Sequence, residues 1–317
     1  MKTMHAILAD TATSVYRRNY WNALRNSNKE SSLFVTNAMG GIPEMYLPME
    51  DDGFIRSKIT EYGTIRSLAT CFRAYDGHAS LWLYDNNDFT EFVGDGDLLP
   101  SSCANKDFRK APMKDHKAAG ITKASTELAG DSSFDFEHYV MKRAARSLSN
   151  TEDKAFICGD GNKGPTGLLH AENGAQTSSV VESIGYDDCI DLFFSVKPEY
   201  RKDAVWIMND RTGLSLRKMK DADGNYLWNP SSEKLLGKRV VICNWMPDAE
   251  PGKKPVLFGD LSYYWIVDFT PVSISALHEL FAMEGQMGYV VREHLDARLV
   301  RPEAVKAIEI KSEKDNG

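Results

Sequence analysis

The stretch "NTEDKAFICGDGNKGPTGLL", residues 150–169, begins like the last turns of a helix and then becomes rich in glycine. Its second half places four glycines, an aspartate, a lysine and a proline within nine residues: Gly159, Asp160, Gly161, Lys163, Gly164, Pro165 and Gly167. A run of this composition either cradles a phosphate group or turns the chain sharply. The choice separates an enzyme that uses a nucleotide from a protein in which the run is structural.

The order of elements argues against phosphate binding. A phosphate-binding loop opens a helix, because free N–H groups and the positive end of the helix dipole then face the anion. Here the helical pattern precedes the loop. The G-x-x-x-x-G-K-[ST] motif is absent, since Lys163 is followed by Gly164, and the G-x-G-x-x-G match at 159–164 follows no predicted strand. We therefore interpret the run as a sharp turn at the end of the helix, in which glycines supply positive φ angles.

A long helix is predicted immediately before the turn, over residues 132–157. Its first residues, Ser132 and Asp135, have the spacing of a capping box. An apolar stripe at helical spacing follows, formed by Phe136, Val140, Ala144 and Leu148. The glycine-rich turn then stands at the carboxyl end of this helix.

The chain before this helix contains an arm, a shorter helix and a long acidic excursion. Residues 15–27 predict an amphipathic helix on a polar tether, whose aromatic face must dock on its own body or on a neighbouring subunit. A second helix starts near residue 50, where Glu50, Asp51 and Asp52 suit the helix dipole, and it stops at Gly63. Strands are predicted at 79–86 and 117–126. The acidic segment between them is too long for an ordinary connection.

The chain after the turn alternates between helix and strand. A helix is predicted at 186–200, ended by Pro198, and a buried strand at 204–209. A further helix runs into a turn at Asp223-Gly224 and an aromatic strand. Side chains alternate with a period of two over residues 289–299, which predicts a strand near the end of the chain.

Composition and motifs exclude several classes of function. The formal net charge of −7 and the scattered basic residues argue against tight nucleic-acid binding. No apolar run is long enough to span a membrane, and no secretory signal is evident. The histidines and carboxylates form no catalytic or metal-ligand pattern, so no catalytic residue, cofactor or metal is expected. The five cysteines lack C-x-x-C spacing and predict reduced thiols: Cys71, Cys103, Cys158, Cys189 and Cys243.

Several stretches, taken in order, resemble the major capsid proteins of tailed bacteriophages, which have the Hong Kong 97-type capsid fold. The resemblance covers about residues 36–310. The stretches that carry it are "GGIPEMYLP", "YGTIRSLAT", "ITKASTELAGDSSFDFEHYVMKRAARSLSNTEDKAFICGDGNKGPTGLL", "YRKDAVWIMNDRTGLSLRKMKDADGNYLW", "LLGKRVVICNWMP", "VLFGDLSYYWIVD" and "GQMGYVVREHLDARLVRPEAVKAI".

This resemblance implies an α+β fold with a set of named parts. The long helix before the turn corresponds to the spine helix of a peripheral domain, and the acidic excursion to an extended β-hairpin loop, the E-loop. The glycine-rich turn then corresponds to the domain junction at which the chain passes from the peripheral domain to the axial domain. The implied boundaries are 1–35 for an N-terminal arm, 36–77 for the first part of the peripheral domain, 78–115 for the E-loop, 116–164 for the peripheral domain with the spine helix, 165–288 for an axial domain, and 289–317 for the last peripheral strand and tail.

The resemblance also implies a non-enzymatic structural protein. The chain would assemble with itself, through pentamers and hexamers, into the icosahedral capsid of a phage or prophage. Its expected partners are a portal protein, a scaffold or protease during assembly, and packaged DNA through non-specific contact, with no membrane. Assembly is expected in the host bacterial cytoplasm and residence in the virion. Candidate contacts between subunits are Tyr20, Trp21, Phe89, Phe92, Phe108 and Lys110.

The sequence departs from the family pattern at two places. Many members carry a scaffolding segment ahead of the arm, which is absent here, so a mature form or a separate scaffold is expected. Some members join subunits by an isopeptide bond between a lysine and an asparagine. Lys110 lies where the lysine would be, but residues 284–294 contain no asparagine. We therefore expect a salt bridge from Lys110 rather than a covalent crosslink.

Two alternatives remain. An encapsulin-like shell of a bacterial nanocompartment shares the fold but encloses enzyme cargo, and the N-terminal arm favours the phage capsid over it. A soluble enzyme that uses a nucleotide is supported only by the glycine-rich run.

Overall fold

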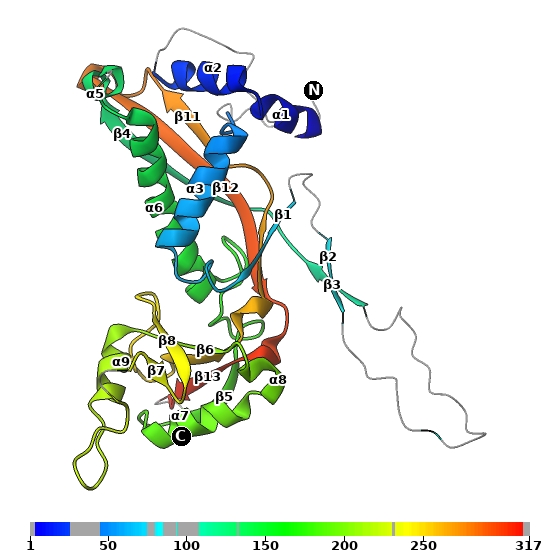
Figure 1. The fold of residues 1–317 in the computed structure, drawn as a ribbon, viewed down its shortest axis with the longest axis vertical. Helices are drawn as coiled ribbons and strands as arrows, with labels where there is room; N and C mark the ends of the chain where they lie inside the picture. The colour runs from blue at the N-terminus through cyan, green and yellow to red at the C-terminus, as the bar shows by residue number, and fades with distance from the viewer. Residues whose placement is uncertain are drawn as a thin grey trace.

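A computed structural model describes residues 4–25, 45–74, 80–84, 93, 108–131, 133–229 and 232–312 of the chain. Figure 1 shows an elongated molecule with one body above another and a narrow hairpin at the side. Each body is built on its own sheet. The five-stranded sheet of the upper body is called the first sheet, and the six-stranded sheet of the lower body the second sheet.

The long strand β12, Gln286–Leu299, organises the first sheet. It pairs antiparallel with three strands, and a fourth strand, β1, runs parallel to β10. The four other strands of this sheet are β1 (Thr70–Arg73), β4 (His116–Ser125), β10 (Tyr264–Asp268) and β11 (Ser273–Leu277). Most of β12 is buried, because helices cover the sheet.

Two helices account for much of this cover: α3, Met49–Tyr62, and α6, Phe136–Cys158. Helix α6 confirms the long helix predicted at 132–157, but it begins at Phe136. The Asp135 carboxylate caps it by accepting the N–H of His138, and Ser132 lies outside the described residues. The prediction that Gly63 ends the earlier helix is confirmed.

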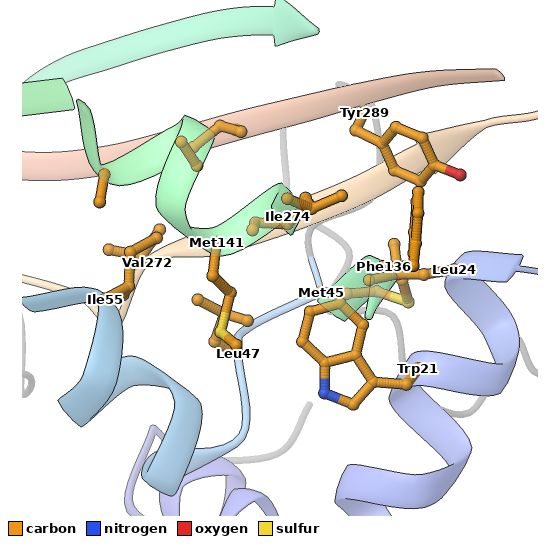
Figure 2. Close-up of a cluster of buried hydrophobic side chains, with 14 of the residues drawn as sticks. Trp21, Leu24, Met45, Leu47, Ile55, Phe136, Met141, Val272, Ile274 and Tyr289 are labelled. Atoms are coloured by element: carbon orange, nitrogen blue, oxygen red, sulfur yellow. The ribbon is translucent and has the colours of Figure 1, made fainter. Parts of the chain in front are cut away.

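The amino-terminal helices α1 (Met4–Thr11) and α2 (Ser14–Arg25) lie at the far end of the upper body. The short helix α5, Thr126–Gly130, follows β4. Figure 2 shows Trp21 and Leu24 of α2 facing Phe136 and Tyr289 in the core of this body. The rings of Phe136 and Tyr289 lie 5.3 Å apart between centroids.

The second sheet has the strand order β5-β13-β9-β6-β8-β7. Its strands are β5 (Gln176–Val181), β6 (Val205–Met208), β7 (Lys234–Leu235), β8 (Lys238–Ile242), β9 (Val256–Gly259) and β13 (Val305–Ile310). Its helices are α7 (Tyr186–Ser195), α8 (Pro198–Arg201) and α9 (Asp210–Arg217), and three 3₁₀ turns lie at Leu261–Tyr263, Ala282–Glu284 and Pro302–Ala304. The aromatic strand expected after Asp223-Gly224 is wrong, because this segment forms a turn closed by one bridge between Lys220 and Tyr226.

The two sheets do not divide the chain at the boundaries predicted from the sequence. Strands β10 and β11 fall within 165–288 but belong to the first sheet with β12. Strand β13 falls within 289–317 but belongs to the second sheet, between β5 and β9. The chain therefore returns to the first sheet before residue 288 and crosses back after β12.

The hairpin at the side consists of β2, Ser80–Tyr84, and β3, Phe108–Pro112. Strand β2 confirms the strand predicted at 79–86. Strand β3 lies inside the predicted acidic excursion, where the local sequence pattern predicted no strand and only the family resemblance implied a β-hairpin. Among the described residues these two strands pair only with each other.

Candidate assembly surfaces and the core that holds them

The glycine-rich turn closes α6 by using its own backbone donors. The N–H of Gly159 donates to the carbonyl of Ala155, and the N–H of Gly167 donates to the carbonyl of Gly159. The Asp160 carboxylate accepts the N–H groups of Asn162 and Lys163, which lowers the pKa of Asp160. These donors already have partners, so they cannot form the cradle that a phosphate requires.

The turn is also fixed to β12 and β10. The N–H of Thr166 donates to the carbonyl of Ala297 at 3.0 Å, and the hydroxyl of Tyr264 donates to the carbonyl of Thr166 at 2.8 Å. Pro165 and Gly167 are buried. The run therefore lies where the chain leaves α6 and enters the lower body.

The glycines serve a different purpose from the one predicted. Only Gly161 among these four has a positive φ, at 69°. Gly159 and Gly167 are required by close backbone contact, because an added Cβ would lie 2.0 Å from the Pro165 carbonyl oxygen and 2.5 Å from the Gly159 nitrogen, respectively. Gly164 has open space around its Cα. The correction is that tight packing of two chain segments, more than backbone handedness, explains this composition.

We expect Gly167→Ala to destabilise the subunit by about 1–3 kcal/mol, because the methyl group would press on the backbone of Gly159 and Ile157. Gly164→Ala is the matched control and should leave the stability unchanged or raise it slightly. Urea denaturation followed by tryptophan fluorescence measures both. Equal stability of the two variants would contradict the packing role of Gly167.

The buried side chains beside the turn form a core shared by both sheets, here called the junction core. Phe156, Ile157 and Leu168 pack in one cluster with side chains from β10, β12, β6, β9 and β13. Members from the first sheet include Ile266 and Leu295. Members from the second sheet include Ile207, Leu257 and Val305. The turn is thus embedded in the connection between the two bodies.

A buried ionic cluster lies between α3, α6 and the first sheet. The Arg66 guanidinium forms paired hydrogen bonds with Glu152, at 2.6 and 2.8 Å, and with Asp268, at 3.0 and 3.1 Å. Arg56 donates to Glu293 and lies 2.9 Å from Asp268. All five side chains are at most 5% exposed. Paired hydrogen bonds between opposite charges offset the free-energy cost of removing these groups from water.

Burial and pairing act in opposite directions on the groups of this cluster. For Asp268, burial would raise the pKa, but Arg56 and Arg66 outweigh it and hold the pKa below its ordinary value. For Glu152, burial prevails over Arg66 and raises the pKa well above its ordinary value. Two arginines thus face four buried carboxyl groups, those of Asp52, Glu152, Asp268 and Glu293. Removing either arginine would leave buried carboxylates without their nearest cation.

Tyr20 and Trp21 are buried within their own chain, whereas the sequence suggested them as contacts between subunits. Their side chains are 0% and 3% exposed within their own chain. The Tyr20 hydroxyl donates to the carbonyl of Ile274, and the Trp21 indole donates to Asp51. Arg17 also binds Asp51 through two nitrogen atoms. The aromatic face of α2 therefore docks on its own body.

Four of the predicted contact residues fall in or near the hairpin, and the structure describes the exposure of one of these four, Lys110. Lys110 is exposed and lies opposite Trp82, whose side chain is 60% exposed. Phe108 begins β3, and its side chain is not described. Phe89 and Phe92 lie outside the described residues. The base of the hairpin is fixed by Arg298, which donates to the Pro112 carbonyl, and by the Lys114 N–H, which donates to Asp296.

Within the described residues, no group of three or more acidic, histidine or cysteine side chains is placed to hold a metal ion. No described helix combines the length and the apolar character that a membrane crossing needs. Cys71, Cys158, Cys189 and Cys243 are free thiols, and Cys103 lies outside the described residues.

Solved structures share this fold. The capsid of a native GTA particle, computed with C5 symmetry, matches with a TM-score of 0.65 and 21% identity over 90% of this chain and 95% of that chain. A chain of Microbacterium phage Oxtober96 matches with a TM-score of 0.58 and 15% identity over 93% and 99%. A chain of Gordonia phage Cozz matches with a TM-score of 0.55 and 13% identity over 79% and 87%. The fold is therefore the α+β Hong Kong 97-type capsid fold.

The sequence model of the phage capsid family matches residues 47–310. The chain belongs to this family and is a structural protein of a capsid shell. No curated protein sequence matches it.

Proposed function

We propose that this chain assembles with itself, through pentamers and hexamers, into the icosahedral shell around a phage or prophage genome. The observation that carries the proposal is the hairpin of β2 and β3. A two-stranded hairpin alone is marginally stable in water. Here its strands find no further strand among the described residues, and Trp82 is exposed. A neighbouring subunit that covers this hairpin would supply the missing support.

The parts of the family fold are assigned on the same basis. Residues 78–115 would form the E-loop, with the hairpin as its base. Helix α6 would be the spine helix, and the first sheet with α3 and α6 the peripheral domain. The second sheet with α7, α8 and α9 would be the axial domain, which meets its copies around the symmetry axes.

The remaining partners follow from the role of a shell. A portal protein would occupy one vertex, and a scaffold or protease would act during assembly in the host bacterial cytoplasm. Packaged DNA would touch the shell only non-specifically, in keeping with the net charge of −7. The chain would have no catalytic activity, and an encapsulin-like shell is the less favoured alternative.

Negative-stain electron microscopy of the purified protein tests the proposal. We expect closed shells or rings of capsid subunits, because a heterologous contact that closes produces rings. Analytical ultracentrifugation should show species far larger than the 35.5 kDa chain. A stable monomer under every assembly condition, including macromolecular crowding and varied salt, would contradict it.

A further inference from the structure

The two ends of the second sheet carry opposite charge. Strand β5 forms one end of the strand order, and α7 packs beside it. Residues 171–195, which contain both, include no lysine or arginine, and the basic side chains that reach this segment from neighbouring elements are Lys254, Lys306 and Arg201. The surface of this segment is called the acidic edge. Its five acids are Glu172, Glu182, Asp187, Asp188 and Asp191.

The other end of the sheet is basic. Strands β7 and β8 form it, and Gly213 of α9 lies against Ile242 of β8. Residues 211–245 contain three acids, Asp221, Asp223 and Glu233. The surface of this segment is called the basic edge. Its seven basic residues are Arg211, Arg217, Lys218, Lys220, Lys234, Lys238 and Arg239.

Both edges also expose large apolar side chains. On the acidic edge, Val180 is 56% exposed and Phe194 is 64% exposed. On the basic edge, Leu214 and Ile242 are exposed. Exposed apolar groups with charged groups around them are typical of protein contact surfaces. Figure 1 shows α7 along the lower side of the lower body and α9 at its left.

We propose that the basic edge of one copy docks on the acidic edge of the next copy, head to tail, and that this contact closes the rings of the shell. The inference rests on the proposed function, which supplies the ring sizes, and names the surface that joins the copies. A head-to-tail contact uses two different patches, which must be complementary to each other rather than each to itself. The two edges are complementary because their charges have opposite sign, and their exposed apolar side chains supply surface that the contact would bury.

Docking of the basic edge on DNA is the competing explanation. It accounts for the lysines and arginines, but it gives no role to the acidic edge or to exposed Leu214 and Ile242. The phosphate backbone attracts cations and offers little apolar surface. A second copy of the chain accounts for both edges together.

Charge reversal on each edge tests the contact. The first variant carries Glu182→Lys, Asp187→Lys and Asp191→Lys, so that both of its edges become basic. The second carries Lys218→Glu, Lys234→Glu and Arg239→Glu, so that both become acidic. These six residues are exposed, so each variant should fold, as thermal unfolding will verify. Each variant alone should lose rings and shells by more than about tenfold, because like charges then meet at every contact.

Restoration is the decisive part of the test. A chain that carries all six changes has both edges reversed and should recover rings. An equimolar mixture of the two variants can alternate around a ring, and each contact is then complementary. Alternation closes without a like-charged contact only when the number of copies is even. The mixture should therefore form hexamers and no pentamers, whereas wild type forms both.

The outcomes separate the possibilities. Loss in each variant with recovery in the six-change chain supports the proposal. Wild-type assembly by both variants, or loss without recovery, would overturn it. Normal assembly with loss of DNA binding in the second variant would overturn it in favour of a DNA surface. If wild-type protein itself forms neither rings nor shells, it is the proposed function that fails.

Discussion

Arg66→Met is expected to lower the free energy of unfolding by about 3–5 kcal/mol, the range found when one partner of a buried ion pair is removed. The substitution keeps a long side chain but leaves Glu152 and Asp268 without the guanidinium that binds them. Glu293 loses a cation 3.6 Å away as well. These carboxyl groups come from α6, β10 and β12, so the loss would loosen the helix and the sheet from one another. Equilibrium urea denaturation gives the value.

The control for this experiment is Lys58→Met, on α3, where the lysine side chain is 25% exposed. Lys58 pairs with Glu61 at the surface, where water screens the charges, so its loss should change the stability far less. The comparison separates the effect of burial from that of removing a positive charge. Similar unfolding midpoints for the two variants would refute the structural importance of the ionic cluster.

Removal of the hairpin is expected to abolish shells while the subunit stays folded. Ser80 and Pro112 are paired across β2 and β3, so a short glycine-rich turn can replace residues 81–111 without straining either end. None of the described side chains of this segment belongs to the core clusters of the two bodies. The melting temperature should therefore stay near that of wild type, and sedimentation should show no assembled species.

A milder variant distinguishes the surface of the hairpin from its mere presence. Trp82→Ser keeps the strands and their backbone pairing but removes the large exposed side chain. We expect it to reduce the yield of shells without altering the melting temperature. Shells at wild-type yield from the truncated chain would show that the hairpin is not an assembly element.

Local patterns in the sequence predicted most helices and several strands, but not which sheet each strand joins. The helical spacing of apolar residues and the N-cap residue Asp135 located α6 within a few residues, because both are local signals in the sequence. The placement of β11 and β13 depends on pairing with segments far away along the chain. Strand β3 was missed because its sequence, "FRKAP", has no alternation of apolar and polar residues.

The acidic residues at the start of α3 show why part of the site could not be predicted from the sequence. Asp51 and Asp52 had a sufficient local explanation as acids at the start of a helix, yet both are buried. Asp51 binds Trp21, and Asp52 accepts the N–H of Val272, 220 residues away in sequence. A charged residue looks the same in the sequence whether water or a distant partner satisfies it. For the same reason, the sequence left open whether Tyr20 and Trp21 dock on their own body or on a neighbouring subunit.

The junction core has a consequence for the geometry of the shell. Side chains of both sheets interlock around Phe156 and Leu168, and the glycine-rich turn is bonded to β12 and β10, so the chain has no hinge between its bodies at this point. A closed icosahedral shell is curved, and the curvature arises either within the subunits or at the contacts between them. Because each subunit is stiff along its length, the curvature of the shell arises from the angle at which one copy meets the next.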